Sequence, residues 1–287
     1  MLFERVSIIG LGLLGGSWAL ALKRNGLAGA VHGCDRREIL QRAASMKAID
    51  DGSEDVGDAV RDADLVVMAA PVAAILDLLP TLPAAISTQA LITDVGSTKR
   101  LICERAERLF RGAALFLGGH PMAGKQRSGL EHADGSLFRN ARYALIPLRP
   151  DDVADSRVKA LTSLLTEMGA VPFVTDAATH DRAVAFLSHL PQLVSTGLAS
   201  LIAEQSAGNF LPLEFAGPGF RDVTRLAESP YTVWRDICLS NGENIRSALG
   251  ALIQKLQRME TGLNDGELER DFSEGFRLRE KLYGPEL

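Results

Sequence analysis

The amino-acid sequence predicts an α/β protein in which a doubly wound parallel sheet is followed by an all-α domain. In the first part of the chain, short apolar runs alternate with helical segments, the pattern of a parallel sheet with helices on both faces. After about Asp176 the strand-like runs stop, and long helical patterns continue to the C-terminus. We therefore expect a sheet domain over residues 1–176 and a helical domain over residues 177–287.

Seven apolar runs are the predicted strands of the sheet, and each is short and bounded by turn-forming or polar residues. Helices are expected in most of the gaps between them, including one over Ser17–Arg24. The strands are expected at Val6–Gly10, Ala30–Cys34, Leu65–Ala69, Ala90–Asp94, Ala114–Gly118, Tyr143–Pro147 and Val171–Val174.

Long apolar patterns predict the helices of the second domain. Residues 178–207 form one such pattern, in which Pro191 is expected to kink the helix or end its first part, because proline lacks a backbone N–H. Glycines and a proline in residues 216–220 predict an irregular loop. Further helices are expected over Tyr231–Leu263 and Asp265–Leu282. Their apolar faces are expected to form core and a homodimer interface.

The composition excludes several classes of protein. With 46% apolar and 23% charged residues, the 287-residue chain has the composition of a soluble globular protein. A net charge of -5, without any block of Lys or Arg, argues against a nucleic-acid partner. The chain has no basic leader and no run of about 18 apolar residues, so neither a signal peptide nor a membrane partner is expected.

Cysteine usage favours a reducing compartment. Cys34, Cys103 and Cys238 are widely spaced and form no CxxC pair, so no metal or redox site is predicted. Their odd number gives no disulfide framework. We expect a cytoplasmic protein without a bound metal.

A glycine-rich turn near the N-terminus predicts a dinucleotide site. Gly10, Gly12 and Gly15 follow an apolar strand and open a helix. Gly10 permits the tight turn, Gly12 lets the backbone approach a pyrophosphate, and Gly15 allows close packing of the helix. The helix N-terminus, with Leu13 and Leu14, offers its free N–H groups to the phosphates.

Asp35, at the end of the second predicted strand, indicates which dinucleotide binds. Its carboxylate suits the ribose hydroxyls of NAD and repels a 2'-phosphate, which favours NAD over NADP. The neighbouring Arg36 and Arg37 leave a phosphate-facing role open. A second cofactor contact is expected at Ala70 and Pro71, since the carboxyl ends of parallel strands line the crevice of such sheets.

Two polar stretches follow later predicted strands, where a doubly wound fold presents its catalytic groups. They are residues 94–99 and 118–124, and the second contains His120 beside two glycines. An imidazole titrates near neutral pH, so His120 is the expected general base for a hydroxyl proton as hydride leaves the same carbon. Lys99 and Lys125 are compatible with an anionic ligand, although solvation is expected for both, and His32 and His132 are expected to have no role in the site.

Six motifs occur in one order along the chain. They are GLGLLGGS from residue 10, DVGSTK from 94, GGHPMAGKQRSG from 118, THDR from 179, SHLPQ from 188 and GFRDVTRLAESP from 219, followed by Trp234. In this set and order the chain resembles the prephenate and arogenate dehydrogenases of tyrosine biosynthesis. The resemblance implies an N-terminal Rossmann-type NAD domain, a C-terminal substrate-binding and dimerisation domain, and oxidative decarboxylation of a small-molecule substrate.

The same resemblance implies roles for individual residues. His120 accepts the proton of the substrate ring hydroxyl, Ser97 hydrogen-bonds and places that hydroxyl, and Arg225 binds a substrate carboxylate. Five further positions match residues that line or support the family's pocket, namely His180, Ser188, His189, Ser229 and Trp234. For His189, which precedes Leu190 in an apolar helix, a buried core histidine is an equal alternative.

Two amides stand where many members of that family have titratable or charged side chains. Gln192 takes the place of a histidine after SHLP, and Gln126 takes the place of an acidic residue. Both are expected at the substrate pocket. Prephenate and arogenate differ only in their side chain, which is a keto acid in prephenate and an amino acid in arogenate. These amides are therefore expected to affect the choice between the two substrates. The resemblance implies a prephenate dehydrogenase, with arogenate or both substrates as the alternative.

Two other functions are compatible with this order of domains. A β-hydroxyacid dehydrogenase uses a lysine on the first long helix of its second domain, and residues 177–205 contain no lysine. A non-catalytic NAD-binding sensor would lack the base, whereas His120 is present together with Ser97 and Arg225. Arg221 and Asp222 are interpreted as a surface ion network.

Overall fold

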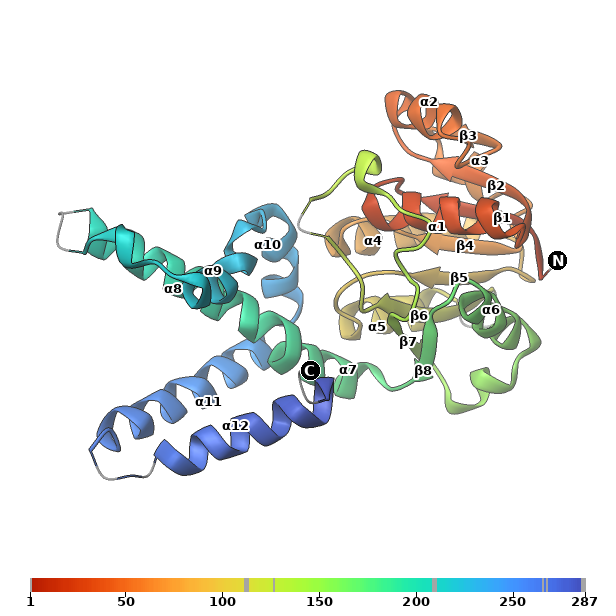
Figure 1. Ribbon diagram of the computed structural model, residues 1–287. Helices are drawn as coiled ribbons and strands as arrows, with labels where there is room; N and C mark the ends of the chain where they lie inside the picture. The colour runs from red at the N-terminus through yellow and green to blue at the C-terminus, as the bar shows by residue number, and fades with distance from the viewer. Residues whose placement is uncertain are drawn as a thin grey trace. The chain divides into compact units, whose positions relative to one another are not determined.

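One sheet of eight strands organises the first part of the chain. The computed structural model describes residues 2–110, 114–125, 127–207, 211–264, 266 and 268–284. The strands are β1 (Phe3–Ile9), β2 (Ala28–Cys34), β3 (Asp51–Ser53), β4 (Leu65–Met68), β5 (Leu91–Asp94), β6 (Leu115–Pro121), β7 (Arg142–Pro147) and β8 (Val171–Val174). Their order across the sheet is β3-β2-β1-β4-β5-β6-β7-β8 (Figure 1).

The sheet differs from the predicted one in two respects. β3 is an additional strand, and its sequence Asp51-Gly52-Ser53 has no apolar run that would have predicted it. The pair β6 and β7 is antiparallel, whereas every other neighbouring pair is parallel. A parallel neighbour requires a crossover connection, usually an α-helix, and the described part of the β6–β7 connection contains only the short 3₁₀ helix η2 (Leu130–His132).

Helices cover both faces of this sheet (Figure 1). On one face, α1 (Leu13–Asn25), α2 (Arg37–Ser45) and α6 (Ser156–Glu167) share one hydrophobic core with the strands, to which β1 and β4 contribute Val6, Ile8 and Val67. On the other face, α3 (Val56–Val60), α4 (Val72–Leu78) and α5 (Arg100–Leu109) pack on Ile9, Val66 and Met68. Because successive side chains of a strand point to opposite faces, the same strands supply both cores. The doubly wound fold class predicted from the sequence is confirmed.

A long helical stretch follows the sheet and contains a widened turn. α7 (Ala177–Val184) continues into the π-helical turn η4 (Ala185–His189) and then into α8 (Leu190–Ser206). The backbone N–H of Leu190 bonds to Ala185 O, five residues back. Pro191 stands in the first turn of α8, directly after the π-helical turn. The helical stretch does not end at Pro191; the regular α-helical pattern is instead interrupted just before it, over Ala185–His189.

Two segments after α8 differ from their predicted form. The expected loop at residues 216–220 contains the start of α9 (Pro218–Thr224), since a proline at the first helical position is already set for the helix. α9 leads into the 3₁₀ helix η6 (Arg225–Glu228). The single helix expected over Tyr231–Leu263 is two helices, α10 (Tyr231–Ser240) and α11 (Gly242–Thr261), which break at Asn241.

The remaining short elements are 3₁₀ helices in connections: η1 (Leu79–Ala84), η3 (Pro150–Ala154) and η5 (Leu213–Phe215).

The stretch Ala177–Ser206 is long and apolar enough, by length and composition alone, to cross a membrane, although no membrane-spanning helix was expected from the sequence. Only 22% of its most apolar window is buried within the single chain. Its side chains His180, Asp181 and His189 are buried and bond to other parts of the same unit.

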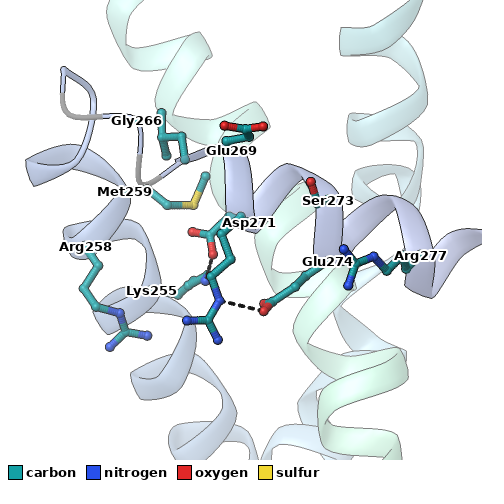
Figure 2. A pocket seen from close by; sticks show the side chains of 11 residues that line it. Lys255, Arg258, Met259, Gly266, Glu269, Asp271, Ser273, Glu274 and Arg277 are labelled. Atoms are coloured by element: carbon teal, nitrogen blue, oxygen red, sulfur yellow. Dashed lines mark hydrogen bonds and ion pairs between the residues drawn. The ribbon is translucent and has the colours of Figure 1, made fainter.

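Residues 243–287 form a separate compact unit. Its two helices, α11 and α12 (Leu268–Tyr283), are joined by an ion pair between Lys255 and Asp271. A cavity of about 780 Å³ lies against this pair and is lined mainly by charged side chains, among them Arg258, Glu274 and Arg277 (Figure 2). α12 leaves large apolar side chains exposed, including Phe272 and Phe276.

Candidate active site

The glycine turn has the geometry that a dinucleotide pyrophosphate requires. Gly10 has a φ of 90°, and a Cβ on Gly15 would lie 1.8 Å from Gly10 O, so the turn and the helix start are closely packed. A Cβ on Gly12 would meet open space. α1 begins at Leu13 and has no acidic residue in its first turn, which leaves its N-terminus suited to an anion.

A cavity of about 470 Å³ adjoins this turn and fits an adenosine group. It is lined by Leu11 and Gly12 from the turn, by Asp35 and Arg36 after β2, and by residues of α2 and the β6–β7 connection. The backbone N–H of Leu11 donates to Asp35 Oδ2 at 2.7 Å, which fixes the carboxylate beside the glycine turn. Arg36 is exposed and lies 3.4 Å from Glu38. The chemistry of these residues fits NAD, because a carboxylate at this position is the type of group that accepts from ribose hydroxyls.

Ala70 and Pro71 lie at the same edge of the sheet. β1 and β4 are neighbours, and the order of strands reverses between them. The open crevice at such a reversal is where doubly wound folds bind ligands. A Cβ on Gly10 would lie 2.7 Å from Ala69 O, so the two strand ends meet closely beside Ala70. Pro71 precedes α4 as its N-cap residue.

His120 lies at the end of β6 and is joined to a second histidine. Its Nδ1 lies 2.8 Å from Nε2 of His180 on α7, and the two rings are 5.0 Å apart at 64°. His180 Nδ1 lies 2.8 Å from Asp181 Oδ1. Asp181 also accepts the backbone N–H groups of Lys99 at 2.7 Å and Arg100 at 3.0 Å, at the start of α5.

This chain of hydrogen bonds assigns the tautomers of both rings. An ionised Asp181 only accepts, so His180 Nδ1 carries the proton and its Nε2 is the acceptor. His120 Nδ1–H must then be the donor, which leaves His120 Nε2 as a bare nitrogen. Burial, together with nearby His180, Lys99 and His189, holds the pKa of His120 well below its usual 6.5. His120 is thus a neutral imidazole with one nitrogen available as a base.

The same hydrogen bonds bear on Asp181 and on the predicted role of His180. Burial favours the protonated form of Asp181, but the bonds from His180 and the two backbone N–H groups outweigh it, so its pKa lies below the usual value. Both ring nitrogens of His180 bond to protein groups. His180 therefore orients His120, and contact with substrate through its nitrogens is not available in this arrangement.

Lys99 is buried, contrary to the expectation that it is solvated. Its side chain has no exposed surface and forms an ion pair with Asp94, which is equally buried. Lys99 Nζ also donates to Gly119 O at 2.7 Å. Asp94 comes five residues earlier, and the chain turns back between them, which the spacing in the sequence does not reveal.

A second group of predicted residues is joined through Asn241 and α8. Asn241 Nδ2 donates to Asp181 O at 2.8 Å and lies 3.3 Å from His189 Nδ1. The rings of His189 and Trp234 meet edge to face, 5.8 Å apart. Burial lowers the pKa of His189 to about 4; Asp181 opposes this shift and His180 adds to it.

Gln192 links α8 to the segment that contains Arg225. Its Nε2 donates to Leu226 O at 2.7 Å and to Thr196 Oγ1 at 3.1 Å. Arg225, one residue before Leu226, begins η6 and has an exposed side chain. The predicted carboxylate-binding residue is thus anchored through its neighbour while its guanidinium remains exposed.

The other predicted site residues lie at the borders of this region. Ser97 is half-buried in the segment between β5 and α5, Ser188 is exposed in η4, and Ser229 is half-buried after η6. Within the described part of the chain, these three serines make no hydrogen bond to His120. Gln126, also predicted at the pocket, lies outside the described residues.

The structure adds residues that the sequence reasoning did not select. Asp94, Asp181 and Asn241 are buried and bond to predicted site residues or to their neighbours. The signal was available for two of them, because Asp94 and Asp181 stand inside the motifs DVGSTK and THDR. Asn241 has no such signal and is found only from its contacts.

Comparisons with known proteins agree with this geometry. The model of the prephenate dehydrogenase nucleotide-binding domain matches residues 18–174, and that of the prephenate dehydrogenase dimerization domain matches residues 176–278. The chain belongs to the prephenate dehydrogenase family. Its membership makes it an NAD-dependent dehydrogenase and confirms the resemblance on which the roles of individual residues were based.

Individual members of the prephenate dehydrogenase family are similar over nearly the whole chain. The prephenate dehydrogenase of Bacillus subtilis is 34% identical over 97% of this chain and 77% of its own length. The structure of the A. aeolicus prephenate dehydrogenase in complex with hydroxyphenyl propionate and NAD+ has a TM-score of 0.87 at 28% identity, with 97% of each chain covered. Synechocystis arogenate dehydrogenase has a TM-score of 0.81 at 31% identity, covering 97% of this chain and 99% of that one.

Proposed function

We propose that this protein is a prephenate dehydrogenase that oxidises and decarboxylates prephenate to 4-hydroxyphenylpyruvate with NAD. The observation that carries the proposal is the chain Asp181–His180–His120, which ends in a bare Nε2 at the carboxyl edge of the sheet. Prephenate has a ring hydroxyl whose proton must leave as the carbon is oxidised. A neutral, oriented imidazole beside the dinucleotide site is the group that this step needs.

The reaction follows from the groups at the site. His120 Nε2 takes the hydroxyl proton, and Ser97 hydrogen-bonds the same oxygen. NAD, when bound, supplies the hydride acceptor. The oxidised ring then loses its carboxylate as carbon dioxide, and the electron pair of the broken bond completes the aromatic ring. The proton on His120 returns to the phenol oxygen, which restores the neutral base.

Arg225 is proposed to hold the substrate by a carboxylate. A guanidinium presents two parallel N–H donors that match a carboxylate in a bidentate pair. The exposed Arg225 side chain and the anchoring of Leu226 by Gln192 support this role. Ser188, His189, Ser229, Trp234 and Gln126 are proposed to line or support the same pocket.

Arogenate, which carries an amino acid side chain in place of the keto acid, is the second candidate substrate. It is supported by the similarity to Synechocystis arogenate dehydrogenase and by the neutral amide of Gln192 near Arg225. NADH formation measured with each substrate, and with NAD against NADP, separates these cases. Turnover of prephenate with NAD is expected, and no turnover of either substrate would overturn the proposal.

We further propose a homodimer formed through the C-terminal helices, in the cytoplasm. Large apolar side chains remain exposed on α8 and α10 in the single chain, including Leu187 just before α8, Leu201 and Leu239. Exposed apolar surfaces of this kind mark interaction sites, and a second copy of the chain would remove them from water. Sedimentation of the wild type and of Leu201→Glu tests this: a dimer is expected for the first and weaker association for the second.

A further inference from the structure

The pair Asp94 and Lys99 is buried beside His120 without any part in the reaction described above. Both side chains have no exposed surface. Taking two charges out of water has a large desolvation cost, which a buried pair offsets only with good geometry and additional hydrogen bonds. A buried ion pair at this position therefore indicates a role other than stabilisation of the fold, and its hydrogen bonds indicate which residues it acts on.

Those hydrogen bonds converge on Gly119, the residue before His120. The backbone N–H of Gly119 donates to Asp94 Oδ1 at 3.1 Å, and Gly119 O accepts from Lys99 Nζ at 2.7 Å. Both polar groups of this one peptide position are thus bound by the pair. A Cβ on Gly119 would lie 2.4 Å from Asp94 O, so the ends of β5 and β6 are pressed together at this point.

Position 99 is also linked to the imidazole of His120, through Asp181 and His180. The backbone N–H of Lys99 donates to Asp181 Oδ1, the oxygen that lies 2.8 Å from His180 Nδ1. His180 in turn bonds to the His120 ring. The Lys99 side chain therefore binds the main chain before His120, while the backbone at position 99 holds the partner of the imidazole. On the other side, Asp94 Oδ2 accepts from Gly96 N at 2.8 Å and so holds the segment that contains Ser97.

We propose that Lys99 and Asp94 are positioning residues for the reaction, which fix His120 relative to Ser97 and place a permanent positive charge near the base. The inference rests on the proposed function, in which His120 is the base. Lys99 and Asp94 need not touch substrate or NAD. Their side chains act through Gly119 and the segment that contains Ser97.

The charge of Lys99 adds an effect on proton affinity. His120 is surrounded by His180 on α7, His189 in η4 and Lys99 before α5, and all three favour its neutral form, after burial itself. The other titratable groups near His120 are Asp94, which pairs with Lys99, and Asp181, which bonds to His180. Tyr143 lies on the neighbouring strand β7, opposite Pro121. Removal of Lys99 is thus expected to raise the pKa of His120 and to move the acidic limb of kcat/KM to higher pH.

The test compares Lys99→Met, the double variant Lys99→Met/Asp94→Asn, and the exposed control Lys159→Met. The double variant removes both charges, so it avoids an unpaired buried carboxylate, and the amide that replaces the Asp94 carboxylate still has an oxygen that can accept from Gly119. We expect kcat with prephenate to fall roughly 10- to 100-fold in the double variant, the size of effect that a misplaced group of about 1 Å produces. The Kd for NAD should stay within about 2-fold, the acidic limb should move up, and the control should match the wild type.

Two outcomes would overturn the inference. One is a folded double variant with the kcat and pH profile of the wild type, and the other is a loss confined to the Kd for NAD. Should neither variant fold, nitrogen NMR of the wild-type histidines decides, because His120 must then show a bare Nε2 and resist protonation below pH 6.5. Failure of the proposed function is separate, since it is seen in the wild type as absence of turnover.

Discussion

His120 and His180 share one hydrogen bond of 2.8 Å between Nδ1 and Nε2. Because His180 is itself bonded to Asp181, the direction of that bond is fixed, and with it the nitrogen of His120 that remains bare. The arrangement has the logic of a catalytic triad in which the base is oriented by a third group, with one more imidazole in the chain.

Replacement of the base itself should remove most of the activity. His120→Asn is expected to lower kcat roughly 100-fold or more, the usual size for loss of a general base, while the Kd for NAD is kept. Steady-state kinetics and a titration of NAD binding measure the two effects. Lys159→Met, an exposed position on α6, is the control. An unchanged kcat in His120→Asn would remove His120 from the mechanism.

Asp181→Asn tests the orientation of the two rings. The amide keeps one oxygen, for the backbone N–H of Lys99, and loses the second oxygen, which accepts from Arg100; it also no longer requires the proton of His180 to be on Nδ1. Loss of the correct tautomer should lower kcat at least about 10-fold, with little change in substrate KM. Kinetics and thermal unfolding together check this. A fall in apparent kcat that only follows a loss of folded protein would contradict an orienting role.

Arg225→Ala tests the carboxylate contact. The side chain is exposed at the start of η6, so its truncation should leave the fold intact. The substrate KM is expected to rise roughly 10-fold or more, the scale of a lost charge-assisted hydrogen bond, and Arg225→Lys should recover only part of it because it lacks the planar fork. If the KM for NAD rises instead, the assignment to substrate is wrong.

His189 should make the stability of the protein depend on pH. Its pKa is lowered from the usual 6.5 to about 4. Between these pH values the His189 imidazole is protonated in the unfolded state and neutral in the folded state. Stability is therefore full above pH 6.5 and is lost as the pH falls toward 4, by up to about 1.4 kcal/mol per pH unit. Denaturant unfolding of the wild type and His189→Leu over this range measures it. The variant should have the flatter profile, and equal slopes would exclude His189 as a cause.

Much of the fold could be predicted because its strands are apolar and its turn residues are distinctive. The runs at β1, β4 and β5 each give a strand close to the predicted position. β3 has the sequence Asp-Gly-Ser and forms only because β2 offers a parallel edge at His32–Cys34. No local pattern contains that information.

The site was predictable at the level of motifs but not at the level of contacts. His120 and His180 both stand in motifs, yet nothing in a distance of 60 residues along the chain indicates that their rings meet. Lys99 was expected in solvent because most lysines are, and only the fold shows that Asp94 and Gly119 enclose it. Tertiary contacts of this kind decide whether a charged residue is solvated or buried.

The π-helical turn Ala185–His189 makes the site depend on residue count as well as residue type. In an uninterrupted α-helix, residues nine positions apart lie about half a turn out of phase, so His180 and His189 would face away from each other. The widened turn absorbs one extra residue; His180 bonds to Asp181, and His189 contacts Asn241, which itself donates to Asp181 O. The same residues wound as a regular α-helix would leave every histidine of the site present in the sequence and rotate His189 and Gln192 by about 100° relative to His180.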